Sequence, residues 1–321
     1  MLRAFLSPKM PRLENPKKLE PLRASATLPV SVIVAARNEA RNLPRCLESL
    51  REAAEVYVID SQSTDATAEI AESYGAQVIQ FHYPGGWPKK RQWAMDSLPL
   101  THDWILLIDA DEALSPELVS EIQQATASPA FDGYYIDLRM FFLGRQLRHS
   151  GASFRKLALF RRGKARFECR LHRQDDSMAD MEVHEHVVAD ANARLSKLRF
   201  PLIHHNVESL SHYIQKHDKY SNWEARVWFE GEGSARDLPP SFFGSQAQRR
   251  RWLRKAFFSF PGSPIAFFLY RYVLRLGFLD GVPGLIYCAF QGTQFFHIKA
   301  KIFELKKSGM RRGKRSSDVR N

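Results

Sequence analysis

Three acidic residues, Asp109, Asp111 and Glu112, follow a short apolar segment in the first half of the chain. The segment, residues 104–108, predicts a buried parallel strand with the acids at its carboxyl end. Ligands of open α/β sheets bind at the carboxyl ends of the strands. On an extended backbone alternate residues share a side, so Asp109 and Asp111 point the same way. Two such carboxylates suit a hard divalent cation, Mn²⁺ or Mg²⁺, that also binds substrate phosphate. The alternative is a solvated acidic turn before a helix near Ser115.

Two other predicted strands also end in polar side chains. Residues 30–35 are followed by Arg37 and Glu39, and residues 56–59 are followed by Asp60. Because the carboxyl ends of parallel strands meet at one edge of a sheet, we expect all these groups to line the same site. Asp60 suits a base N–H or a ribose hydroxyl, and Arg37 and Glu39 suit the rest of a nucleoside. A simple helix-entry turn is an equal alternative for Asp60.

A cluster of cations begins the helix that is expected between the third and fourth strands. Gly85 and Gly86 form a hinge, and Lys89, Lys90 and Arg91 follow it. At a helix N-terminus beside the same sheet edge, Arg91 or Lys90 would meet a diphosphate, because the helix dipole adds to the attraction. A solvated basic turn is the alternative interpretation.

These elements must be positioned by a sheet. Their strand–helix order predicts an α/β fold with a doubly wound sheet, and residues 131–144 and 155–161 predict further strands that close the acceptor side. No strand is followed by a Gly-x-Gly-x-x-Gly or Walker motif, which weakens the dinucleotide and P-loop interpretations. The expected divisions are a flexible lead-in at 1–27, a catalytic domain at 28–205, a helical acceptor or membrane-interface region at 206–305 and a basic tail at 306–321.

Composition and charge narrow the functional class. The 321 residues are 44% hydrophobic and 26% charged, as in a globular protein. The net charge of +12 belongs to the C-terminal end, because residues 241–321 hold 16 Lys+Arg and 3 Asp+Glu, against 31 and 32 elsewhere. Three widely spaced cysteines indicate neither a disulfide framework nor a zinc site. We expect no secretory signal and no spanning helix, since no uncharged apolar window reaches about 20 residues.

A further carboxylate, Glu185, lies in the segment 181–188. If this segment is extended, Glu185 shares a face with valines, and partial desolvation raises the pKa of its carboxyl toward that of a useful base. His184 and His186 then lie on the opposite face, so we do not expect a three-ligand metal site here. His204 and its neighbour His205 are expected to be structural.

The chain resembles the family 2 glycosyltransferases in the order and spacing of three segments: residues 30–39, the cluster Asp60-x-x-Ser63-x-Asp65-x-Thr67, and DAD at 109–111. That family has the GT-A fold, which contains a Rossmann-like mixed sheet. KKRQWAM at 89–95, DADE at 109–112 and HEH at 184–186 are similar to the lipopolysaccharide-core glucosyltransferase type. The resemblance spans about residues 29–305.

The resemblance implies a set of site residues, carried over by matching positions. Asp60 would contact uracil or its ribose, Arg91 would lie near the diphosphate, and Asp111, supported by Asp109, would be the main metal ligand. Glu185 would be the catalytic base, with Glu182 as the reserve. Two positions depart from the pattern: Arg37 stands where Tyr is frequent, and Gln62 replaces the usual Gly.

The basic C-terminal end predicts a different kind of surface. Residues 248–257 predict an amphipathic helix with Trp252 on its apolar stripe and Arg251, Arg254 and Lys255 on the other side. This composition is typical of a helix in the interface of an anionic membrane. The alternatives are an intramolecular helical cap on the catalytic domain and a nucleic-acid surface. Residues 248–252 also fit, weakly, the Gln-x-x-Arg-Trp motif of processive synthases.

We therefore expect a metal-dependent, inverting glycosyltransferase. It would move the hexose glucose from a UDP-linked sugar to a lipid-linked or lipopolysaccharide-core saccharide. It would act peripherally at the cytoplasmic face of the inner membrane, with no nucleic-acid partner. A polyprenyl-phosphate glycosyl synthase is the alternative enzyme, since its phosphate acceptor requires no strong base. A basic nucleic-acid-binding protein is a distant alternative, because acids at strand ends repel phosphate without a metal.

Overall fold

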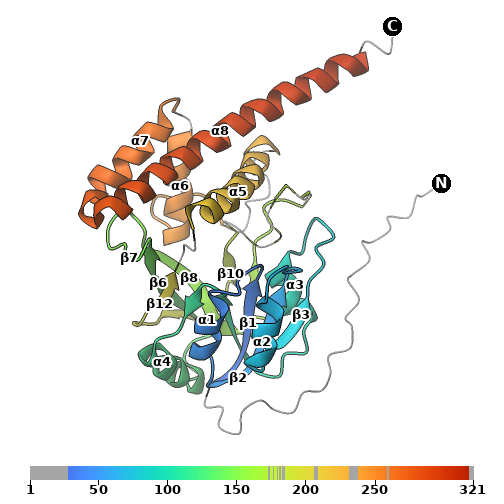
Figure 1. Cartoon of the computed structure of the whole chain (residues 1–321), viewed down its shortest axis with the longest axis vertical. Coiled ribbons are helices and arrows are strands. Elements are labelled where there is room, and N and C mark those ends of the chain that lie inside the picture. The colour runs from blue at the N-terminus through green and yellow to red at the C-terminus, as the bar shows by residue number, and fades with distance from the viewer. Residues whose placement is uncertain are drawn as a thin grey trace, which may run out of the picture.

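The protein consists of an α/β domain with a layer of helices on one side of it (Figure 1). The computed structural model describes residues 28–172, 174, 175, 177, 178, 180, 182, 185–205, 209–230, 238–258 and 260–317, with side chains to residue 308. The expected lead-in, 1–27, and His184 lie outside these residues.

A mixed sheet forms the centre of the α/β domain. Its strands run in the order β3-β2-β1-β4-β8-β6-β12-β5, with β7 and β11 paired to β6. The first four are parallel, whereas β8 is antiparallel to both β4 and β6. The bounds are β1 (Leu28–Ala36), β2 (Ala53–Asp60), β3 (Gln77–Gln80), β4 (Trp104–Asp109), β5 (Glu112–Ala113), β6 (Gly133–Phe142), β7 (Arg145–Gln146), β8 (Phe154–Arg161), β11 (Leu195–Lys197) and β12 (Leu202–His205). A separate pair joins β9 (Ala165–Phe167) to β10 (Val187–Ala189).

Helices cover both faces of the parallel strands, which explains why the central strands β1 and β4 are largely apolar and buried. Alternate residues of β1 point to opposite faces. Val32 packs in the cluster that includes Leu47 of α1 and Ile122 of α4, while Ile33 packs in the cluster that includes Trp93 of α3. The helices of this domain are α1 (Leu43–Ser49), α2 (Thr67–Ser73), α3 (Lys90–Ser97) and α4 (Pro116–Ala127).

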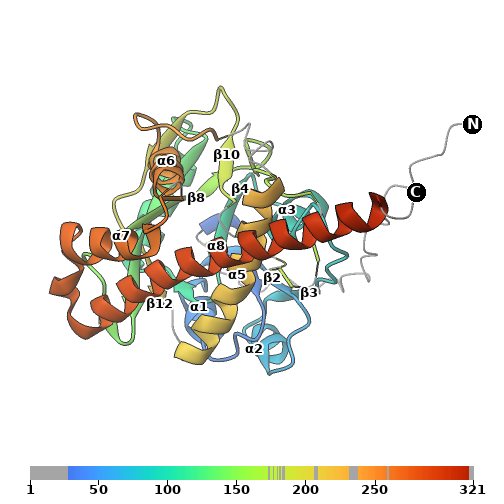
Figure 2. The ribbon, with the colours of Figure 1, turned by 90° about the horizontal axis from the view of Figure 1, so that it is seen from above.

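The remaining described helices form the outer layer. They are α5 (Leu210–Glu230), α6 (Gln246–Phe258), α7 (Ser263–Leu269), η1 (Tyr270–Leu274), η2 (Gly277–Asp280) and α8 (Gly281–Ser317). Seen from above, α8 crosses over α5 (Figure 2), where Lys301 pairs with Asp218 at 2.6 Å. Helix α8 runs without a break through residues 305 and 306, between which the basic tail was expected to begin.

Length and apolar composition decide whether one of the outer helices is able to cross a bilayer. Within the described ranges, no single helix is both long and apolar enough to span a membrane. Ser263–Leu274 and Gly277–Ser308, which meet at a bend of 72°, satisfy the same length and composition criteria only when taken as a pair.

Candidate active site

The carboxyl ends of β1, β2 and β4 bring the predicted acids to one edge of the sheet. The register pairs Ala36 of β1 with Asp60 of β2, and Ala35 with Asp109 of β4. Asp60 and Asp109 therefore flank β1 at the same level. Helix α5 approaches this edge from the outer layer, since its Lys216 Nζ lies 4.0 Å from Asp111 Oδ2.

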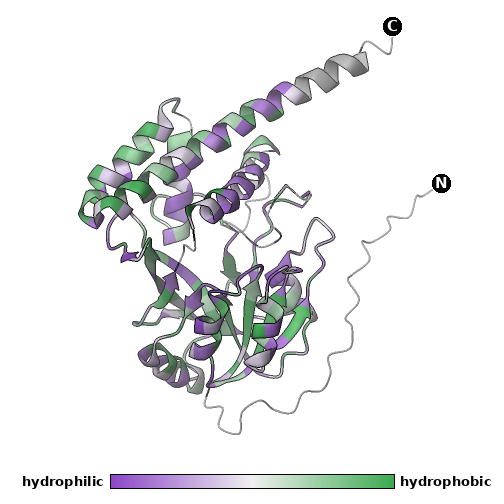
Figure 3. Ribbon diagram, in the orientation of Figure 1, coloured by the Kyte–Doolittle hydropathy of each residue, from purple (hydrophilic) through white to green (hydrophobic). Residues whose placement is uncertain are grey.

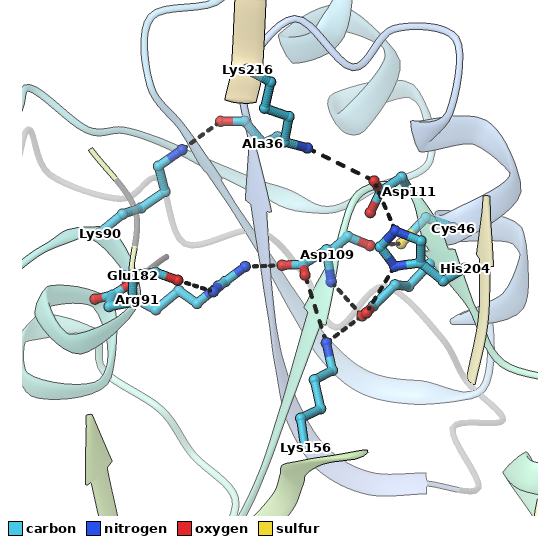
Figure 4. Close-up of polar contacts among 11 residues, drawn as sticks. Ala36, Cys46, Lys90, Arg91, Asp109, Asp111, Lys156, Glu182, His204 and Lys216 are labelled. Carbon is cyan, nitrogen blue, oxygen red and sulfur yellow. Dashed lines mark hydrogen bonds and ion pairs between the residues drawn. The ribbon is translucent and has the colours of Figure 1, made fainter. Parts of the chain in front are cut away.

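Asp109 lies between two cations (Figure 4). Its Oδ1 contacts a guanidinium nitrogen of Arg91, and its Oδ2 is 3.7 Å from Lys156 Nζ. Burial raises the pKa of the Asp109 carboxyl, but Arg91 and Lys156 outweigh that effect, so the pKa lies well below its ordinary value. Asp109 is therefore ionised at neutral pH, and it holds Arg91 at the sheet edge.

Asp111 and Glu112 point to a different set of partners. Asp111 Oδ2 lies 3.5 Å from His204 Nε2, while Glu112 Oε2 accepts hydrogen bonds from the Asp109 N–H at 2.9 Å and from Lys156 Nζ at 2.5 Å. Glu112 is fully buried. It therefore fixes the loop that carries the two aspartates.

His204 was expected to be structural, yet it faces Asp111 across the edge of the site (Figure 4). Burial lowers the pKa of the imidazole, but Asp111 and Glu112 raise it by more, and the pKa reaches about 9. Its Nε2 is buried and makes no hydrogen bond among the residues that the structure describes. The surroundings therefore stabilise positive charge between Asp111 and His204.

These two side chains fit a divalent cation as a partial ligand set. A carboxylate oxygen and an imidazole nitrogen 3.5 Å apart are close enough to share one ion, whose other ligands would be water and diphosphate oxygens. Across the described ranges, no group of three or more His, Cys, Asp or Glu side chains is arranged around a metal position. Substrate oxygens are therefore needed to complete the coordination.

Asp60 occupies a polar turn at the end of β2. Its carboxylate accepts hydrogen bonds from the Ser63 N–H and hydroxyl and from Gln80 Nε2, the last at 2.9 Å. Gln62 adopts a left-handed conformation with φ 55°, which costs a non-glycine residue roughly 1–2 kcal/mol. Its amide contacts His82 Nδ1 at 2.5 Å. The turn therefore keeps the shape that glycine would favour.

The two polar residues after β1 are placed differently from each other. The Arg37 guanidinium is more than half exposed and lies 3.9 Å from Asp180. The Glu39 carboxylate accepts a hydrogen bond from Asn42 Nδ2 at 2.8 Å. Arg37 is thus available to a ligand at the rim, while Glu39 supports the start of α1.

Glu185 forms a buried ion pair with Lys89. Its Oε2 is 2.7 Å from Lys89 Nζ, and both side chains are fully buried. Burial raises the pKa of the Glu185 carboxyl, Lys89 opposes this, and the pKa is about 7. Glu182, the reserve candidate, instead accepts hydrogen bonds from the N–H groups of Arg91 and Gln92 at the start of α3.

A pocket of about 360 Å³ brings some of these residues together. Asp109, Arg91 and Glu185 line it, although Glu185 is distant in sequence from the other two. Its remaining charged or ionisable lining residues are Tyr135, Arg155, Lys156, His186 and Arg249. Arg37, Glu39, Asp60 and Asp111 do not line this pocket. The structure therefore separates the predicted residues into a group on the pocket and a group beside it.

Two of the three basic residues predicted on the polar side of α6, Arg251 and Arg254, pair with buried acids. Arg251 is buried and pairs with the buried Glu168 at 2.5 Å, and Arg254 pairs with the buried Glu224 at 2.8 Å. Pairing with Glu168 turns the Arg251 guanidinium into the interior, while the Arg254 side chain stays partly exposed beside Glu224. Trp252 and Lys255 do remain exposed. Near its start, α6 contributes to the wall of the pocket.

The fold and the site define an α/β enzyme with acidic and basic groups at the carboxyl ends of parallel strands. The family model described as glycosyl transferase family 2 matches residues 31–179. A lipopolysaccharide core biosynthesis glycosyltransferase, LpsC of Rhizobium meliloti, is 31% identical over 62% of this chain and 71% of its own length. An uncharacterized glycosyltransferase of Rickettsia felis is 32% identical over 61% and 69%. The chain belongs to glycosyl transferase family 2 and is a glycosyltransferase.

Two solved structures are more remotely similar. TarS 1–349 of S. aureus, in complex with UDP-GlcNAc, is 15% identical over 87% of this chain and 92% of its own, with a TM-score of 0.41. Glucosyl-3-phosphoglycerate synthase of Mycobacterium tuberculosis, in complex with Mn²⁺, UDP and glucosyl-3-phosphoglycerate, is 22% identical over 38% and 47%, with a TM-score of 0.28. Scores this low do not establish a shared arrangement of the whole chain.

Proposed function

We propose that this protein transfers the hexose glucose from a UDP-linked sugar to a hydroxyl group of a lipopolysaccharide-core or other lipid-linked saccharide. The transfer inverts the configuration of the anomeric carbon and uses Mn²⁺ or Mg²⁺. Family membership supports the reaction class. The name of the Rhizobium relative supports the acceptor, and the ligands of the remote structures are of the proposed donor class.

The observation that carries this proposal is the shared pocket of Asp109, Arg91 and Glu185. Asp109 holds the Arg91 guanidinium at the strand ends, where it is placed to attract a diphosphate. Glu185 is a carboxylate with a pKa of about 7, raised by burial, and such a group both binds and releases a proton near neutral pH. A leaving-group site and a base are thus assigned to separate parts of one pocket.

The transfer is a single displacement. The acceptor hydroxyl oxygen bonds to the anomeric carbon while the bond from that carbon to the diphosphate oxygen breaks on the opposite face. The hydroxyl proton passes to Glu185, and the electron pair of the broken bond stays on the nucleoside diphosphate. Asp111 and His204 would hold the divalent cation, which when bound offsets the charge on the diphosphate. Arg91 adds a second positive charge there.

The experiment that tests this proposal is transfer from UDP-glucose by the Glu185→Gln variant. We expect the transfer rate to fall by about 10²- to 10⁴-fold, because glutamine does not accept the acceptor proton, while UDP binding persists. Glu182→Gln is the matched control, since Glu182 binds backbone N–H groups of α3 and should affect the rate less. Glu185→Asp, which keeps a base, should retain more activity than Glu185→Gln. Full activity of a folded Glu185→Gln protein would remove Glu185 from the mechanism.

A further inference from the structure

Exposed apolar side chains are concentrated on the outer helices. Of the eighteen large hydrophobic residues that are exposed in the described part of the chain, eleven lie between Ile265 and Phe303. Leu274 is 74% exposed, Ile265 is 70% exposed and Val282 is 68% exposed. Figure 3 shows the same concentration of hydrophobic residues over α7 and the first part of α8. We call the exposed apolar side chains of residues 265–303 the α7–α8 surface.

On α8 this surface is a stripe along one side of the helix. Its exposed positions are 282, 285, 289, 293, 296, 300 and 303, which are spaced by three or four residues and are apolar except for Thr293; the exposed Glu304 follows directly after them. At the α-helical rise they extend over about 30 Å. The side of α8 that binds α5, through Gln294 and Lys301, is opposite the stripe. One side of α8 therefore packs on the protein, and the other has no partner among the described residues.

The charge around the α7–α8 surface indicates what covers it. Arg275 is exposed at the bend, and Lys306 and Lys307 are exposed just beyond the stripe. Glu304 is the one exposed acidic residue between positions 265 and 308, so the described margin of the surface is net positive. Two copies of a net positive surface repel each other, whereas anionic lipid attracts it. An apolar stripe with cations at its margins is the pattern of a helix that lies in a membrane interface.

The α7–α8 surface is also fixed to the catalytic domain. Asp280, the last residue of η2, is buried and accepts hydrogen bonds from the His149 N–H at 3.0 Å and the Ser150 hydroxyl at 2.8 Å. Arg271 donates to the Ser150 carbonyl oxygen at 2.8 Å and to that of Gly151 at 2.9 Å. These residues belong to the segment 145–151, which lies between β6 and β8. The hydrogen bonds anchor this segment to the outer helices shortly before β8 begins.

We propose that the α7–α8 surface binds the interface of an anionic lipid bilayer, with α8 lying along the membrane. The buried anchors at Asp280 and Arg271 then hold the catalytic domain at a fixed orientation to the bilayer. Because β8 carries Lys156, which contacts Asp109, the anchored segment leads directly to the candidate active site. The α7–α8 surface lies within the region 206–305 expected from the sequence, but it uses the apolar sides of α7 and α8 rather than the arginines of α6.

The test is flotation of the full chain with vesicles of phosphatidylglycerol and phosphatidylcholine, without any sugar donor. The triple variant Ile265→Gln, Leu274→Gln and Val282→Gln changes three highly exposed side chains, so we expect it to fold normally. We expect it to bind these vesicles at least tenfold more weakly, because a tenfold loss of affinity is on the order of the free energy of burying one apolar side chain. Vesicles of phosphatidylcholine alone should bind the unaltered protein more weakly. Thermal unfolding of each variant checks the fold.

A matched pair of single variants separates this surface from general hydrophobicity. Leu269 on α7 is 48% exposed and Ile214 on α5 is 47% exposed. We expect Leu269→Gln to weaken vesicle binding and Ile214→Gln to leave it unchanged. Equal vesicle binding by the triple variant and the unaltered protein would overturn the proposal. So would a dimer, seen by sedimentation, that the triple variant abolishes while neither protein binds vesicles. Because vesicle binding is measured without donor, it does not depend on the proposed reaction.

Discussion

The ion pair of Lys89 and Glu185 determines whether Glu185 works as a base. Two fully buried charges 2.7 Å apart stabilise each other, while removal from water destabilises both. For Glu185 the effect of burial exceeds that of Lys89, so its carboxyl is neutral below about pH 7 and ionised above it. Lys89 therefore keeps this pKa within a useful range.

We predict that the transfer rate rises with pH through about 7, because only the ionised carboxylate accepts a proton. Lys89→Met should move the midpoint to higher pH, since loss of the ammonium removes the charge that lowers the pKa of Glu185. Single-turnover transfer measured across pH gives both midpoints. Lys197→Met, which removes a partly exposed lysine paired with Asp137, should leave the midpoint unchanged. Identical midpoints in the Lys89 variant and the unaltered protein would contradict the assignment.

Helix α6 shows how an element with a correct helical pattern can turn its charges inward. The stripe of apolar residues predicted the helix, but it did not predict that Arg251 and Glu168 pair in the interior. The Arg251 guanidinium also donates to the Leu238 carbonyl oxygen at 2.6 Å. This pair attaches α6 to the segment that follows β9, so α6 acts as an intramolecular cap, one of the alternatives for the basic region.

We predict that Arg251→Met destabilises the protein by about 3–5 kcal/mol, because it leaves the Glu168 carboxylate buried without its cation. Denaturant unfolding measures the loss. Arg51→Met is the control: Arg51 forms an exposed pair with Glu48 at 2.7 Å, and its loss should cost no more than about 1 kcal/mol. Adding Glu168→Gln to the Arg251 variant should restore part of the stability. Equal losses in the two arginine variants would mean that Arg251 is exposed in solution.

For the whole molecule, binding of donor and metal should appear as stability, because a ligand bound only by the folded state stabilises it. We predict that UDP with Mn²⁺ raises the melting temperature, corresponding to about 2.7 kcal/mol at a ligand concentration one hundred times Kd. EDTA should remove the metal-dependent part of this increase. Asp111→Asn should abolish that part, and His204→Ala should reduce it.

His205→Ala is the matched control for the histidine variant. The ring of His205 stacks on Phe141 with centroids 4.7 Å apart, whereas the ring of His204 faces Asp111. We expect His205→Ala to keep the full Mn²⁺-dependent increase in melting temperature. The same metal response in His204→Ala and His205→Ala would exclude His204 as a ligand.

The sequence by itself determined the order of the first four strands and their helices, and the sheet edge at which Asp60 and Asp109 lie. Apolar runs and their polar ends are local signals, and parallel strands place their carboxyl ends together. Only the tertiary structure decided the partners of the charged groups. Arg251 binds an acid 83 residues away, and His204 contacts Glu112, 92 residues away. Such pairs leave no periodic signal, because burial and proximity arise only when distant segments pack.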